Sequence, residues 1–116
     1  MSVIHIESKD QFKKEVLDNK GLTIVDFRAS RCGPCRMLGP IIDQLAEKYP
    51  NVKVVKVSVE EHQDLAAAFE VSSIPVVYFI KDGKAIERIV GVNPPTVYEE
   101  RIAEHSKPAQ EEKMAA

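Results

Sequence analysis

The sequence predicts an α/β fold in which a mixed central β-sheet of about five strands is flanked by four helices. Segments with strand and helix periodicity follow one another in the order β-α-β-α-β-α-β-β-α along the 116 residues. Two strand segments are apolar almost throughout, as expected where both faces of a sheet are covered. The last two strands are joined by a link of hairpin length, whereas the earlier ones are joined through helices. The sheet should therefore contain both parallel and antiparallel pairs.

The first third of the chain contains a short strand, a helix and a longer strand. Residues 3–6 are expected to form the first strand, and Ser8 with Gln11 matches the capping box that begins a helix. One face of that helix carries Phe12, Val16 and Leu17. Gly21 is well placed to end the helix. The apolar run at residues 22–27 is then expected to be a central strand.

The clearest helical spacing comes after this strand. The apolar residues at that spacing are Met37, Leu38, Ile41, Ile42, Leu45, Ala46 and Tyr49. Pro34 suits the first position of the helix, whereas Pro40 lies inside it and should kink it. A valine-rich strand at residues 52–59 and a shorter helix at residues 63–69 follow.

The last third is expected to form a hairpin and a closing helix. Strands at residues 76–80 and 85–90 are joined by a short link whose central Asp82-Gly83 pair indicates a tight turn. Thr96, with a glutamate three residues later, matches a second capping box, from which the last helix should start. The inner face of that helix would carry Val97 and Ile102.

Length and composition predict one soluble domain. We assign residues 1–106 to that domain and residues 107–116 to a polar tail that frays. Charged residues make up 29% of the chain and are spread along it, with a net charge of −2, so nucleic-acid binding is not expected. No apolar run approaches the roughly 20 residues that span a bilayer, and the first residues do not resemble a secretory signal. We therefore expect a cytoplasmic protein with no membrane partner.

The only two cysteines, Cys32 and Cys35, are three positions apart at the predicted start of the long helix. Disulfide exchange needs a thiolate that attacks and a second thiol that resolves the mixed disulfide. Unpaired N–H groups and the helix dipole would stabilise negative sulfur there. We expect Cys32 to be the exposed attacking thiol and Cys35 the more buried resolving thiol. Gly33 and Pro34 between them would stiffen the link and let a partner chain approach.

Two other interpretations of the cysteine pair stay open. A Cys-x-x-Cys pair is half of a common zinc site, but such a site needs two more ligands. The three histidines, His5, His62 and His105, are scattered, so no metal is expected. A purely structural disulfide is the second alternative. Redox use is preferred because the pair lies near a βαβ pattern.

Asp26 is a carboxylate within the apolar central strand. Buried carboxylates are rare and costly, and burial would raise the pKa of Asp26 toward the range used in proton transfer. The alternative is an exposed residue at the end of the strand. Lys56 lies inside the valine-rich strand, where an ordinary lysine that faces solvent is an equally good interpretation.

Several short motifs are spaced along the chain. They are Val25-Asp26-Phe27, Cys32-Gly33-Pro34-Cys35, Pro40, Ile74-Pro75, and Gly83 followed by Gly91. In this order and spacing, over residues 3–105, they closely resemble the thioredoxin family. The resemblance implies a thioredoxin-like fold and a protein-disulfide reductase. It also implies a monomer with no bound cofactor, which takes electrons from NADPH through a thioredoxin reductase and serves electron transport and cell redox homeostasis.

The resemblance also assigns roles to individual residues. Asp26 would be buried behind the cysteine pair and would help to move the proton of Cys35, with Lys56 close to it. The surface that binds a target chain would consist of Gly33, Pro34, Ile74, a cis Pro75 and Gly91. Backbone groups of this surface would bind the target by short strand addition, which tolerates many partners.

The chain departs from the family in having no tryptophan. Arg31 and Arg28 stand where most members have tryptophans, and Arg36 follows the second cysteine. Their charge favours a thiolate, so we expect a lower pKa for Cys32 and a somewhat more oxidising pair. Alternatively, the guanidinium groups point into water and screening leaves little effect. Loss of the aromatic surface puts docking to the usual reductase in question, and Arg31 is a candidate for binding acidic partners.

Three functions therefore compete. Reduction of protein disulfides leads, an oxidant or isomerase of the same chemistry comes second, and a binding module whose cysteines do not turn over comes third. The equilibrium with glutathione separates the first two, and a double serine variant of Cys32 and Cys35 tests the third.

Overall fold

A computed structural model describes residues 3–106, so the tail expected at residues 107–116 lies outside the described part. The strands are β1 (Val3–His5), β2 (Leu22–Arg28), β3 (Lys53–Ser58), β4 (Val76–Lys81) and β5 (Lys84–Val90). The helices are α1 (Lys9–Phe12), which continues as the π-helix η1 (Lys13–Leu17), then α2 (Gly33–Lys48), α3 (Gln63–Ala68) and α4 (Pro95–His105). The strand order in the sheet is β1-β3-β2-β4-β5, which makes β2 the central strand, as the sequence predicts.

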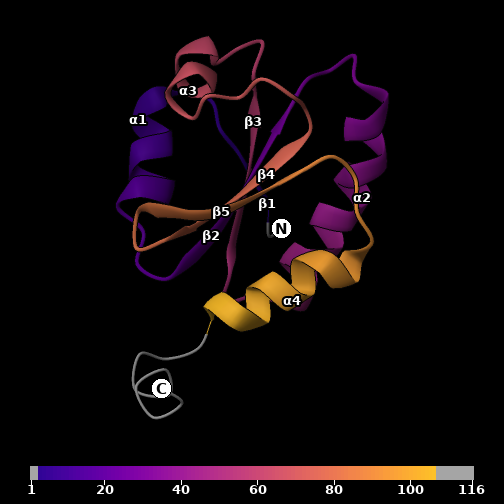
Figure 1. The fold of residues 1–116 in the computed structure, drawn as a ribbon. Helices are drawn as coiled ribbons and strands as arrows, with labels where there is room; N and C mark the ends of the chain where they lie inside the picture. The colour runs from indigo at the N-terminus through magenta and orange to yellow at the C-terminus, as the bar shows by residue number, and fades with distance from the viewer. Residues whose placement is uncertain (1–2, 107–116) are drawn as a thin grey trace.

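The sheet is mixed. Strands β1 and β2 each pair in parallel with β3, whereas β4 runs antiparallel to β2 and β5 antiparallel to β4. Helices α1 and α3 cover one face of the sheet, and α2 and α4 cover the other (Figure 1). The predicted α/β architecture is therefore confirmed. No helix within residues 3–106 is both long enough and apolar enough to cross a bilayer.

Alternate residues of a strand point to opposite faces of the sheet, and here both faces are covered. The core on the side of α2 and α4 includes Ile24, Leu38, Ile42, Val54, Phe79, Tyr98 and Ile102. The core on the side of α1 and α3 includes Phe12, Val16, Val25, Phe27, Val55, Leu65 and Tyr78. Asp26 alternates with Val25 and Phe27, so its side chain shares the face of Ile24 and lies under α2.

The first helix differs from the expected one after its first turn. Ser8 caps it as predicted, since its hydroxyl oxygen accepts a hydrogen bond of 3.0 Å from the Gln11 N–H. The chain then widens into η1, where the Asp18 N–H bonds to the carbonyl of Lys13. Leu17, the last residue of η1, is exposed, whereas Phe12 and Val16, expected on the same face of the helix, are buried. The helical part ends there, and Gly21, with φ of +95°, lies in the following loop.

The starts of the two longer helices also differ from expectation. Gly33 is the first residue of α2, so Pro34 takes the second position, and Pro40 lies inside the helix as predicted. Helix α4 begins at Pro95 with Pro94 as its cap, so the capping box expected at Thr96 is wrong. A proline needs no partner for its missing N–H and already has a helical φ, which favours it over Thr96 as the start. Met37, although at helical spacing, is exposed.

Candidate active site

The cysteine pair lies where α2 begins, directly after β2 and its connecting loop. Cys32 is the N-cap of α2, and its sulfur accepts a hydrogen bond of 3.2 Å from the Cys35 N–H. The two sulfur atoms are joined in a disulfide, so they are within bonding reach of each other. Cys32 is 8% exposed and Cys35 is 1% exposed. Cys32 is thus the more accessible of the two, but both are buried in the disulfide form, so the predicted exposure of Cys32 is wrong.

A second segment packs against this pair. Ile74 and Val59, with the buried Ala29, form a small apolar cluster around the two cysteines. The Ile74–Pro75 peptide bond is cis, as the family resemblance implies. Pro75 itself is buried, and its carbonyl oxygen accepts a hydrogen bond of 2.8 Å from the Gly91 N–H.

The residues expected to bind a target chain come from three segments: the start of α2, the segment that enters β4, and the end of β5. Ile74 packs against the disulfide, and a backbone hydrogen bond joins Gly91 to Pro75, the residue after Ile74. Gly33 and Pro34, between the cysteines, are exposed at the start of α2.

Asp26 is buried without any hydrogen-bond partner. Asp26 is 1% exposed, and neither of its carboxyl oxygens has a partner among the described residues. Removal from water raises the pKa of Asp26 to about 6, although the positive charges of Lys56 and Arg28 act in the opposite direction. The interpretation of Asp26 as an exposed residue at the strand end is therefore wrong. A buried carboxyl with such a pKa can take up or release a proton near neutral pH.

Lys56 does not face solvent as an ordinary strand lysine would. It is the direct neighbour of Asp26 across the parallel β2–β3 pair, so both side chains lie under α2. Its side chain is 11% exposed, and its ammonium nitrogen lies 2.9 Å from the Asp43 Oδ1 atom on α2. Lys56 therefore passes from the sheet to the helix and bonds to Asp43, while Asp26 stays unpaired.

The loop before Cys32 is held by two charged residues. Glu60 accepts hydrogen bonds from the Ser30 N–H (2.9 Å) and from the Ser30 hydroxyl (3.0 Å), and Arg36 donates one to the Ser30 carbonyl (3.3 Å). These bonds to Ser30, together with the charges of Arg31 and Arg28, lower the pKa of Glu60. Arg31 is exposed, directly before Cys32. The arginines therefore do not act alone on the thiols, because a carboxylate lies among them.

Sequence reasoning did not single out Glu60, Ser30 or Asp43. One signal was present for Glu60, since it follows β3 closely, as the Cys32 loop follows β2. The carboxyl ends of neighbouring parallel strands meet at one edge of a sheet, which is where ligands and functional groups gather. Asp43 gives no such signal in the sequence.

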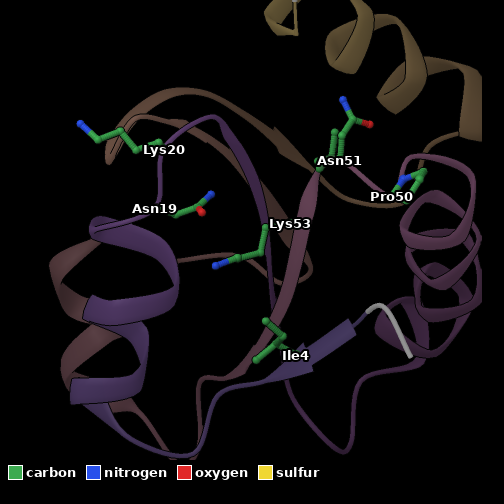
Figure 2. A pocket seen from close by; sticks show the side chains of 7 residues that line it. Ile4, Asn19, Lys20, Pro50, Asn51 and Lys53 are labelled. Carbon is green, nitrogen blue, oxygen red and sulfur yellow. The ribbon is translucent and has the colours of Figure 1, made fainter.

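Two further features of residues 3–106 contribute nothing to this site. No group of three or more histidine, cysteine, aspartate or glutamate side chains is arranged there to hold a metal ion. A hollow of about 400 Å³ lies at the amino ends of β2 and β3 (Figure 2). The cysteines follow the carboxyl end of β2, so the hollow lies at the opposite end of the sheet from them. Its lining includes Asn19, Pro50 and Lys53, and the ammonium of Lys53 already bonds to Glu15 at 2.9 Å.

A disulfide at the start of a helix that follows the central strand of such a sheet defines a dithiol–disulfide oxidoreductase. The family model for thioredoxin matches residues 3–104. The chain is 40% identical to thioredoxin of Chlorobaculum thiosulfatiphilum, over 87% of this chain and 95% of that protein. It is 39% identical to thioredoxin 1 of Synechococcus elongatus, over 90% of this chain and 99% of that protein.

Solved structures agree with these relatives. A thioredoxin of Nicotiana alata superposes with a TM-score of 0.84 at 34% identity, covering 91% of this chain and 94% of that one. A mutant thioredoxin of Halobacterium salinarum superposes with a TM-score of 0.86 at 28% identity, covering 93% and 94%. The chain belongs to the thioredoxin family. It is a protein dithiol–disulfide oxidoreductase with Cys32 and Cys35 as its redox pair.

Proposed function

We propose that the chain works as a reductant of target proteins, with Cys32 as the attacking thiolate and Cys35 as the resolving thiol. The Cys32 thiolate attacks one sulfur of the target disulfide, releases the other as a thiolate and forms a mixed disulfide. Cys35 then attacks the Cys32 sulfur, which forms the Cys32–Cys35 disulfide and releases the second target thiol. The target gains two electrons and two protons, and this chain loses both. The position of Cys32 as the N-cap of α2, with Cys35 one turn on, is the observation that carries this assignment.

Asp26 would accept the proton that Cys35 must lose before it attacks. The support for this role is its burial under α2, the helix that carries Cys35, together with its lack of any hydrogen-bond partner. Its pKa of about 6 lets the carboxylate form exist at neutral pH while keeping it a useful base. Lys56 would act on this step through its charge, since it is the strand neighbour of Asp26.

The target chain would bind across the exposed start of α2 and the segments beside it. The binding residues in this proposal are Gly33, Pro34, Ile74, Pro75 and Gly91. Backbone contacts would account for tolerance of many targets. Arg31, exposed next to Cys32, would favour targets with an acidic residue beside the disulfide, because opposite charges attract across an interface.

The oxidised pair would be reduced again by a thioredoxin reductase supplied with NADPH, so that no cofactor is bound by this chain. We further propose that it acts in the cytoplasm, as a monomer whose domain ends near residue 106. In this role it would serve electron transport and cell redox homeostasis.

Insulin reduction with NADPH and a panel of reductases tests the proposal. We expect turnover with at least one reductase, no turnover for Cys32→Ser, and a trapped target adduct for Cys35→Ser, detected by mass spectrometry. A glutathione equilibrium well on the oxidising side, with poor insulin reduction, would instead support an oxidant or isomerase. Full biological activity in the double serine variant would support a binding module.

A further inference from the structure

One ammonium group and two carboxylates meet between the sheet and α2. Lys56 on β3 is paired with Asp26 on β2, and its nitrogen lies 2.9 Å from the carboxylate of Asp43 on α2. The Lys56 nitrogen lies next to Gly39, since a β-carbon placed on Gly39 would be 3.8 Å from it, an ordinary contact distance. Gly39 and Asp43 are one helical turn apart, so they share the face of α2 that Lys56 follows.

The two carboxylates differ sharply in their surroundings. Asp43 is 56% exposed and could be hydrated without Lys56, whereas Asp26 is enclosed and has no partner for either oxygen. A buried carboxylate would ordinarily take the nearest cation as its counter-ion. Here Lys56, the cation that acts most strongly on Asp26, is bonded to the exposed carboxylate instead.

We propose that Asp43 is a positioning residue for proton transfer at the redox pair: by holding the Lys56 ammonium at α2, it leaves Asp26 without a counter-ion and able to accept the proton of Cys35. The proposal rests on the proton-accepting role of Asp26 in the function proposed above. Asp43 itself contacts neither cysteine nor target in this arrangement.

Several charged groups around Asp26 act on the balance between its ionised and protonated forms. Lys56 on β3 and Arg28 on β2 favour its ionised form, and Asp43 on α2 favours its protonated form. On the remaining neighbour strand, β4, the residue paired with Asp26 is Val77, which has no charge. Lys56 has a long side chain, and in this structure its ammonium is held at the far end by the bond to Asp43. Loss of that bond would free the ammonium to approach Asp26.

The test is a titration of the Asp26 carboxyl by carbon NMR in the full chain, wild type against Asp43→Asn. We expect the midpoint to fall by about one pH unit or more, since a close cation lowers the pKa of a carboxyl by about 1–3 units. The matched control is Glu47→Gln, which removes one exposed negative charge from α2 a turn further on. That control should leave the midpoint unchanged, and Asp43→Glu should restore most of the wild-type value.

A second pair of variants isolates the part played by Lys56. Lys56→Met alone should raise the Asp26 midpoint, and Asp43→Asn added to Lys56→Met should then change it little. An unchanged or higher midpoint in Asp43→Asn would overturn the proposal, as would an equal fall with and without Lys56.

The pH profile of mixed-disulfide resolution, measured in a single turnover, separates this proposal from the function on which it rests. We expect the profile of Asp43→Asn to move down in pH with the Asp26 midpoint. If the midpoint moves and the profile does not, the proton-accepting role of Asp26 is what fails. If neither moves, Asp43 does not position Lys56.

Discussion

The backbone N–H of Gly91 donates a hydrogen bond of 2.8 Å to the carbonyl oxygen of Pro75. This bond joins the end of β5 to the segment that enters β4, and Ile74 of that segment packs against the cysteines. Gly91 has φ of +86°, in the left-handed region that residues with a β-carbon rarely adopt. The geometry beside the redox pair therefore depends on a backbone conformation that glycine adopts most easily.

The first prediction is that Gly91→Ala costs about 1–2 kcal/mol of unfolding free energy, through backbone strain. No atom lies within 4 Å of the added β-carbon, so steric overlap should not contribute. Urea unfolding of the oxidised protein measures the cost. Gly33→Ala is the matched control, since Gly33 also has open space but lies in a helix, where alanine is at least as stable as glycine. Equal destabilisation by the two substitutions would contradict the strain argument.

A larger cost is expected at Gly83. Asp82 and Gly83 both have positive φ, as a tight hairpin link between β4 and β5 requires. A β-carbon on Gly83 would also meet the backbone carbonyl of Leu17, which cannot move as a side chain could. Strain and overlap together should cost about 2–4 kcal/mol in Gly83→Ala. The same urea measurement should therefore rank Gly83→Ala below Gly91→Ala in stability, and the reverse order would be inconsistent with this close packing.

The helices and strands could be predicted from the sequence wherever a local pattern has a single physical explanation. The run at β2 has no polar alternation because Ile24 faces α2 and Val25 faces the α1 side, with both sides buried. Burial of Asp26 could be anticipated from its place in that run. Expectation failed at Leu17 and at the start of α4. The first helix widens into the π-helix η1, and α4 begins at a proline instead of at the capping box.

The polar contacts of the site were much less predictable. The Ser30–Glu60 bond joins residues thirty positions apart, and the Lys56–Asp43 bond joins a strand to a helix. A strand pattern indicates which face Lys56 leaves from, but not where a long flexible side chain ends. Such partners depend on how elements pack, so they became visible only when β3 and α2 were placed together.

The burial of Asp26 predicts an unusual dependence of stability on pH. Its pKa is about 6 in the folded chain and is expected to be near its ordinary value, 3.8, when unfolded. Between these values the folded state binds more protons, so the contribution of Asp26 to unfolding free energy falls as pH rises from about 4 to about 6 and stays low above that. The difference corresponds to roughly 3 kcal/mol at neutral pH.

Asp26→Asn should therefore be more stable than wild type at pH 8, by about 2–3 kcal/mol, and similar to it at pH 4. The amide also lacks partners at this buried position, which sets the lower end of that range. Guanidinium unfolding of both proteins across this pH range measures the difference. Taking the difference removes the opposite contributions of Glu15, Glu60 and Glu99, whose pKa values are lowered. A stability difference that does not vary with pH would contradict the raised pKa of Asp26.

Two charges lie beside Cys32, and their removal should shift the pKa of its thiol in opposite directions. Arg31 is exposed directly before Cys32, and Glu60 bonds to Ser30 on the same loop. In the reduced protein, Arg31→Trp should raise the pKa of the Cys32 thiol, because a nearby positive charge is lost. Glu60→Gln should lower the pKa of the same thiol, because the carboxylate that offsets the arginines is lost.

Ultraviolet absorbance of the thiolate measures both variants against pH. Both changes should shrink at high salt, since the groups are exposed and screening weakens their interaction with sulfur. Arg88→Gln, an exposed arginine on β5, is the control for a general change in net charge and should have no effect. An unchanged or lower thiol pKa in Arg31→Trp would refute the arginine effect. If Glu60→Gln then still lowered it, Glu60 would act on Cys32 directly, and the loss of tryptophan would matter for partner binding and not for thiol acidity.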